Sequence, residues 1–180
     1  SLFYSHYDFE LFSNFTFFLD DPVNGDQIRQ FEDRRIFGLK STLFKEADIA
    51  GIPLNLSTGV GLRYDDVNDV ELARTLNRST TLEQLAFGDV DETNVYGFAN
   101  AELDFDKWLI NAGLRLDVLD FNYHDRLQTK YTNLAEQRAI LAPKLNIIYN
   151  PTNELQLFVK SGVGFHSNDT RVVVAQSGEE

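Results

Sequence analysis

The sequence contains no cysteine, which excludes a disulfide framework, thiol catalysis and a thiolate metal site. It also lacks any apolar run of roughly eighteen residues, so a transmembrane helix is excluded, whereas a membrane-spanning barrel of strands is not. Basic residues are few, since 16 Lys and Arg stand against 28 Asp and Glu and give a formal net charge of -12. This balance argues against nucleic acid as a partner, because binding it needs clustered Lys and Arg to displace counterions.

Methionine is absent as well, and the chain begins at Ser1 in strand-like sequence without a visible signal peptide. We therefore expect residues 1–180 to be one partial domain, a section of a longer polypeptide. No Ser/His/Asp arrangement, phosphate-binding loop or carboxylate pair has the spacing of a catalytic site. An enzyme is not expected on this evidence, and neither is a cofactor.

What the sequence does contain is a residue-by-residue alternation of apolar and polar side chains. From Leu54 to Tyr64, apolar residues alternate with polar residues and glycines, and in a strand the two sets face opposite sides. Strands of soluble proteins usually end after about five or six residues, whereas a tilted strand needs about ten to span a bilayer. The alternation therefore favours an all-β fold, a section of an antiparallel up-and-down transmembrane β-barrel.

The pattern predicts about seven strands joined by connections that alternate in length. The predicted strands are Leu2–Leu19, Gln27–Phe44, Leu54–Tyr64, Thr93–Phe105, Trp108–Val118, Gln137–Tyr149 and Leu155–His166. Short or modest connections are expected at Lys45–Ile52, Asp106–Lys107 and Asn150–Asn153. Longer ones are expected at Asp65–Asp91, at Asn122–Glu136 and after Ser167. Such alternation is typical of short periplasmic turns and longer extracellular loops, and it places Trp108 at a membrane interface on the short-turn side.

The interruption from Asp65 to Asp91 is the longest of these connections. Its leucines at positions 72, 76, 82 and 85 are near helical spacing, so a short helix in the loop is one reading of it.

Four segments, in order, resemble the TonB-dependent outer-membrane receptors. They are YDFELFSNFTFFLDDPVNGDQ (Tyr7–Gln27), VGLRYDDV (Val60–Val67), DETNVYGFANAEL (Asp91–Leu103) and LAPKLNIIYNPTNELQLFVKSGVGFHSNDTR (Leu141–Arg171). The last, ending in GFHSND, is the most specific, and the resemblance covers nearly the whole chain.

The resemblance implies a function and a set of partners. Such receptors look like a twenty-two-strand barrel with an N-terminal plug inside, and they import scarce nutrients, such as iron–siderophore complexes, with energy delivered through TonB. The resemblance thus implies location in the bacterial outer membrane, contact with its lipid, a plug domain, the TonB complex and a small-molecule ligand. Seven strands correspond to about a third of such a wall.

Candidate binding residues fall in the expected loops. His124, His166, Asn168 and Asp169 are candidate ligand contacts near strand ends, although scattered histidines are usually ordinary polar residues. Asp89, Asp91 and Glu92 are spaced so that they could present oxygens to Ca²⁺, as could the group Asp65, Asp66 and Asp69, against the simpler reading of a solvated acidic loop. Inward polar residues are expected to solvate the lumen or contact the plug: Asn111, Arg115, Asp117, Lys144, Asn146 and Lys160.

Two other classes of protein fit the same alternation. A passive porin, or a structural outer-membrane barrel, would share the wall but lack a plug domain. A soluble all-β binding module would instead close its apolar face by packing two sheets together.

Overall fold

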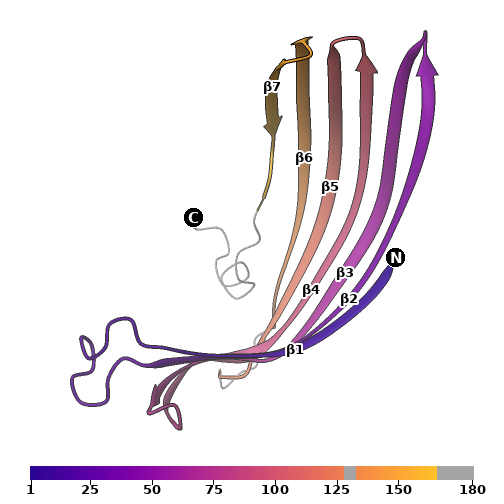
Figure 1. Ribbon diagram of the computed structural model, residues 1–180. Helices are drawn as coiled ribbons and strands as arrows, with labels where there is room; N and C mark the ends of the chain where they lie inside the picture. Colours follow the sequence, from indigo (N-terminus) through magenta and orange to yellow (C-terminus); the bar gives the residue numbers. More distant parts are fainter. Residues whose placement is uncertain (128–132, 166–180) are drawn as a thin grey trace.

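The computed structural model describes residues 1–127 and 133–165. They form one antiparallel sheet in which each strand pairs with the next along the chain, so the order is β1-β2-β3-β4-β5-β6-β7 (Figure 1). The predicted fold class is confirmed, including the number of strands. The strands are β1 (Leu2–Ser13), β2 (Ile28–Ile49), β3 (Ile52–Leu76), β4 (Thr80–Phe105), β5 (Trp108–Asp125), β6 (Asn133–Thr152) and β7 (Leu155–Gly162). Within the described ranges, no helix is long and apolar enough to cross a membrane.

Three tight turns lie together at one end of the sheet, at the top of Figure 1. They join β2 to β3, β4 to β5 and β6 to β7. At the first, Ala50 and Gly51 both have positive φ (55° and 84°), and the Gly51 amide donates to Asp48 at 2.7 Å. Two residues with positive φ match the twist of paired strands, so this turn is tighter than the predicted connection Lys45–Ile52.

The predicted long loop at Asp65–Asp91 is wrong, and so is the suggestion of a helix within it. β3 and β4 continue through this stretch, pair with each other and turn only at residues 77–79, where Asn77 and Arg78 have positive φ. The register shifts between Val67 and Val70 and twice more before the turn. Each irregularity breaks the two-residue alternation, which explains why the leucines there had a spacing close to that of a helix.

Other strand boundaries also differ from the predictions. The first strand ends at Ser13 rather than Leu19, because the chain turns at Phe17 (φ 59°) and the Asp26 carboxylate accepts hydrogen bonds from three backbone amides of residues 19–21. β5 continues to Asp125, beyond the predicted end at Val118. β7 ends at Gly162, whereas the predicted seventh strand extended to His166.

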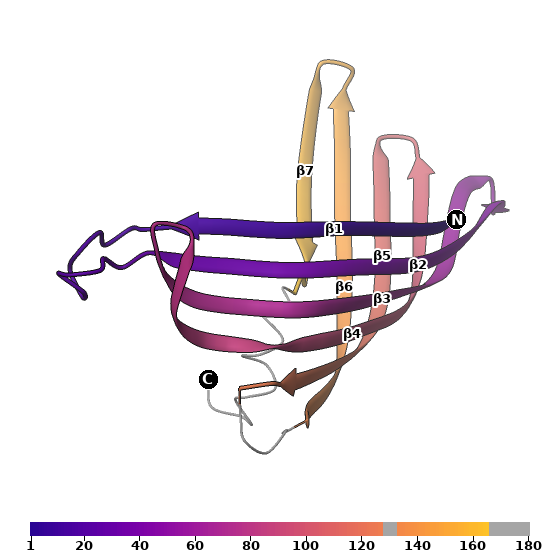
Figure 2. The same ribbon diagram turned by 90° about the horizontal axis from the view of Figure 1, so that it is seen from below.

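The sheet bends strongly along its strands, as Figure 1 shows. We call the end of the sheet with the three tight turns the turn side and the opposite end the loop side. Toward the loop side, β1–β4 run side by side (Figure 2). The buried hydrophobic cluster consists of Val67, Val70, Val90, Leu119, Phe121 and Tyr123. The register places Val67, Val90 and Tyr123 of this cluster in one row and therefore on one face of the sheet.

Candidate functional site

The turn-side half of the sheet separates an apolar face from a polar face. Strand register places Leu62, Val95 and Val118 in one row across three strands, and Val60, Gly97 and Leu116 in the next row. The valines and leucines of these rows are exposed, as are others on the same face: Leu39, Leu43, Leu56, Leu114, Leu141, Leu145, Leu157 and Val159. Exposed apolar side chains in continuous rows, with polar residues behind them, are typical of a lipid-facing surface.

Aromatic side chains border this apolar surface on both sides. On the turn side, the rings of Trp108 and Tyr149 stack at 4.3 Å between centroids. On the loop side, the Phe37 ring lies 4.9 Å from that of Tyr4 and 6.4 Å from that of Tyr64. Aromatic rings at both borders of an apolar band are typical of the two membrane interfaces.

The height of the apolar band matches a bilayer. β5 runs from Trp108 at one border to Asp120, which lies in the row of Thr93 and Tyr64, at the other. At roughly 3.3 Å per residue this stretch is about 40 Å long, or about 30 Å across the membrane at a tilt of about 40°. β4 has 26 residues, so a large part of it lies on the loop side of the band.

On the inner face, Asp117 forms the centre of a charged cluster. Its side chain is fully buried and accepts two hydrogen bonds from Arg115, each 2.7 Å long, and one from Asn94 at 3.1 Å. The Arg115 guanidinium also lies over the Tyr96 ring, 3.7 Å from its centroid. Arg115 and Asp117 both lie on the face opposite the apolar band, which agrees with their predicted inward placement.

A second buried carboxylate, Asp65, lies further toward the loops on the same face. Arg63 donates to it at 2.6 and 2.7 Å, and Arg34 of the neighbouring strand donates at 3.0 Å. A hollow of about 180 Å³ opens beside this group, and Glu92 and Asn94 line it as well. Arg34 also donates to both carboxylate oxygens of Glu32, at 3.2 Å each, so the guanidinium groups around the hollow are already paired with carboxylates.

On the loop side, Arg126 connects the end of β5 to β3 and β4. Its guanidinium contacts the carboxylates of Asp69 and Asp89, the latter at 2.9 Å, and lies over the Phe87 ring. The Asp89 carboxylate also accepts from the Asp69 amide at 3.1 Å. This Arg126 cluster holds the irregular part of β3 in place.

The structure places the candidate calcium ligands on strands rather than in loops. Asp89 forms an ion pair with Arg126, and Asp91 accepts a 2.5 Å hydrogen bond from Tyr64. Glu92 faces the other side of the sheet, beside Asp65. Successive strand residues face opposite sides, so the three do not converge. The second proposed group is likewise divided: Asp65 is buried on the inner face, Asp66 faces Arg35, and Asp69 contacts Arg126.

The candidate ligand contacts are placed only in part. His124 is half-buried near the end of β5, opposite Asp89 in the strand register. His166, Asn168 and Asp169 lie outside the described residues, so the expected approach of His124 and His166 stays a prediction.

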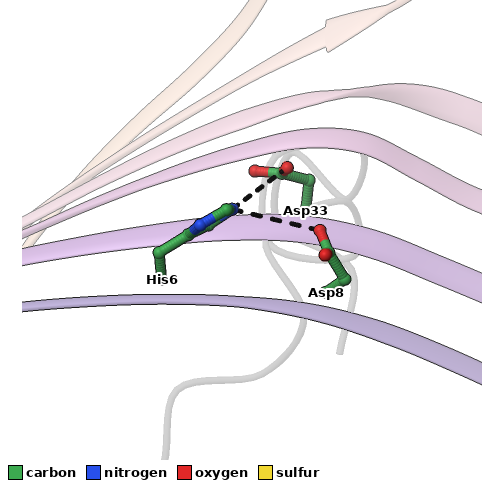
Figure 3. A group of neighbouring side chains, drawn as sticks. All are labelled: His6, Asp8 and Asp33. Carbon is green, nitrogen blue, oxygen red and sulfur yellow. Dashed lines mark hydrogen bonds and ion pairs between the residues drawn. The ribbon is translucent and has the colours of Figure 1, made fainter.

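One group of potential metal ligands lies on the outward face, just loop-side of the aromatic border. The His6 Nε2 atom is 3.2 Å from Oδ2 of Asp33 and 3.9 Å from Oδ1 of Asp8, as Figure 3 shows. The hydrogen bond with His6 lowers the pKa of the Asp33 carboxyl. Sequence reasoning missed this group. His6 and Asp8 alternate visibly in the first strand, but only the register between strands shows that Asp33 lies beside them.

Fold, apolar band, aromatic borders and polar inner face are together typical of the wall of an outer-membrane β-barrel. A comparison with protein-family models agrees: the model of the TonB dependent receptor-like β-barrel matches residues 1–175. The chain therefore belongs to this family, which consists of outer-membrane transport receptors rather than enzymes. A search of the curated proteins found no match.

Proposed function

We propose that this chain is a section of the wall of an outer-membrane receptor that binds a scarce nutrient, such as an iron–siderophore complex, and imports it with energy delivered through TonB. The observation that carries the proposal is the match of 1–175 to the family's barrel, in a sheet with one lipid-facing and one polar face. The wall supplies an apolar band toward outer-membrane lipid, a polar face toward the lumen, and extended strands beyond the membrane that help to capture ligand.

The section belongs to a larger barrel. Among the described residues, β1 pairs only with β2 and β7 only with β6, so each outer edge of the sheet offers backbone groups to a further strand. Unpaired backbone groups are costly inside a bilayer, and closure of the sheet with additional strands satisfies them.

The inner face is proposed as the seat of a plug domain. Asp117 and Asp65 are buried and held by arginines on this face, with the Arg63 and Arg34 guanidinium groups beside the hollow. Fixed charges in a confined, partly dry space recognise a partner of complementary charge better than mobile surface charges do.

Ligand capture is assigned to the loop side of the wall. His124 lies there on β5, and we keep His166, Asn168 and Asp169 as further candidate contacts of the ligand. Replacing His124 with Ala should weaken ligand binding by the full-length receptor while leaving its barrel folded.

Uptake of radiolabelled iron tests the receptor function. Cells that carry the full-length gene are supplied with iron complexed by a hydroxamate or a catecholate siderophore. We expect uptake of one complex that saturates at low concentration and stops when either the receptor gene or the tonB gene is deleted. Uptake that continues without TonB and rises linearly with concentration would identify a passive porin instead. The parent reading frame provides a second check, because the proposal requires a plug domain encoded upstream of the wall.

A further inference from the structure

We propose that His6, Asp8 and Asp33 form a binding site for one divalent transition-metal ion of the zinc class. The site lies on the outward face of the β1–β2 pair, on the loop side of the aromatic row Tyr4–Phe37. It is separate from the lumen and from the loops to which ligand capture is assigned. The register pairs Asp8 with Asp33 directly, and His6 is two residues away on the same face of β1.

The spacing of the three donor atoms suits a single ion. Zinc binds imidazole nitrogen at about 2.0–2.1 Å and carboxylate oxygen at about 2.0–2.2 Å, so two ligands of one ion lie roughly 3–4 Å apart. The His6 nitrogen is 3.2 Å from the Asp33 oxygen and 3.9 Å from the Asp8 oxygen. All three donor atoms lie within 4.8 Å of one another, so small side-chain rotations bring them around one ion.

Two features of Asp33 independently favour a bound cation. Its carboxylate is directly opposite that of Asp8, and like charges at directly opposed positions of paired strands are destabilising. In addition, its Oδ1 atom is shielded from solvent and has no hydrogen-bond partner among the described residues. The Nε of Arg35 is 3.8 Å from that oxygen, which is too far for a hydrogen bond. A metal ion between the carboxylates would relieve the repulsion, and rotation of the Asp33 carboxylate would let the unused Oδ1 atom share in the coordination.

The donor set selects the class of metal. Calcium and magnesium prefer sites made of oxygen alone, whereas one imidazole with two carboxylates suits zinc and neighbouring transition metals. The side chains of His6 and Asp8 are 42% and 68% exposed, so water can complete the coordination. The ligands come from two strands, and the ion would therefore fasten β1 to β2 where both leave the membrane.

Calorimetric titration of the detergent-purified, full-length receptor with ZnCl₂ tests the proposal. We expect saturable binding, and at least tenfold weaker binding at this site after either His6→Ala or Asp8→Asn. The matched control is Asp120→Asn, which removes one outward carboxylate on β5, also at the loop-side border, and leaves the three ligands intact. The control should bind zinc as the wild type does. Retention of heat-modifiable electrophoretic mobility shows that each variant is folded.

Electron paramagnetic resonance with Cu²⁺ gives a second measurement, because it distinguishes a metal coordinated by His6 from a metal held only by the carboxylates. The wild-type spectrum should show coupling to an imidazole nitrogen that the His6→Ala variant lacks. The proposal is overturned if no saturable zinc binding occurs, if His6→Ala binds zinc as tightly as the wild type, or if Ca²⁺ displaces zinc at equal concentration. In those cases His6 serves only as an ion-pair partner of the two aspartates.

Discussion

Arg115 donates two hydrogen bonds, each 2.7 Å long, to the carboxylate of Asp117, which follows it by two residues on the same strand. Side chains two residues apart on a strand share a face, so the pair forms without help from any turn. Asn94 of the neighbouring strand completes the cluster from the side. The pair shows how charge is accommodated on the inner face: Asp117 and Asp65 are each held by an arginine of their own strand.

Removing the Asp117 carboxylate should therefore destabilise the barrel. The Asp117→Ala variant leaves Arg115 without its partner, and we expect the free energy of unfolding to fall by about 2 kcal/mol, since hydrogen bonds to charged groups contribute roughly 1.5–3 kcal/mol. Urea titration of the full-length receptor in phospholipid vesicles measures the change. Asp104→Ala, at an exposed position on β4, is the control and should have little effect. Equal stability of the two variants would contradict the structural role of the pair.

A methyl group at Gly59 should also be costly. A Cβ atom there would lie 2.5 Å from the Ser41 carbonyl oxygen and 2.7 Å from the Phe98 ring, and a backbone atom cannot move aside cheaply. We expect Gly59→Ala to lower the free energy of unfolding by about 1–3 kcal/mol through overpacking. At Gly97, on the lipid-facing side, the nearest atom would be 3.9 Å away, so Gly97→Ala should be nearly neutral. On an electrophoresis gel, we expect Gly59→Ala to lose its heat-modifiable mobility at a lower temperature than the wild type. Gly97→Ala should lose it at the same temperature as the wild type.

Arginine substitutions along one strand should locate the membrane. Leu114 is at the middle of the apolar band on β5 and is 48% exposed, whereas Asn122 follows the loop-side border on the same face. Leu114→Arg should cost about 2–4 kcal/mol in vesicles, and Asn122→Arg about 0–1 kcal/mol, because the penalty falls with distance from the bilayer centre. Equal costs at both positions would mean that the apolar face is not in contact with lipid.

The loop between β1 and β2 should lose order in acid. Backbone amides, that of Asp20 foremost, donate to Asp26 and lower its pKa below the usual 3.8; the amide of Asn24 does the same for Asp21. A carboxyl whose folded pKa is lowered stabilises the fold above the unfolded pKa, and this contribution disappears as the pH falls through the folded pKa. Amide hydrogen exchange of residues 19–26, corrected for the intrinsic rate, should therefore be slow at pH 6 and accelerate below about pH 4.

A variant separates this effect from general acid unfolding. Asp26→Asn should show fast exchange of residues 19–26 already at pH 6, because a neutral amide binds the three backbone donors less strongly. Asp20→Asn changes an exposed carboxyl of the same loop and should exchange as the wild type does. Identical exchange in both variants would assign loop order to something other than the Asp26 carboxylate.

Much of the wall was predictable because alternation is a local property of each strand. The assignment of Leu114 and Leu116 to one face and of Arg115 and Asp117 to the other follows from their order in the chain alone. The prediction failed where β3 and β4 continue beyond the membrane. There, register shifts interrupt the alternation, and neither face has to be apolar, so the pattern no longer identifies a strand.

The sequence by itself determined the fold class, the presence of about seven strands and, where the alternation is regular, the face on which a side chain lies. Only the tertiary structure decided which residues meet across strands. Asp33 lies beside His6 and Asp8 because the β1–β2 register pairs Asp8 with Asp33. In the same way, the Asp65 carboxylate accepts a hydrogen bond from Arg34 of the neighbouring strand. The physical reason is that register depends on turn geometry and on bulges distant from the residues it brings together, whereas the facing of a side chain depends only on its own strand.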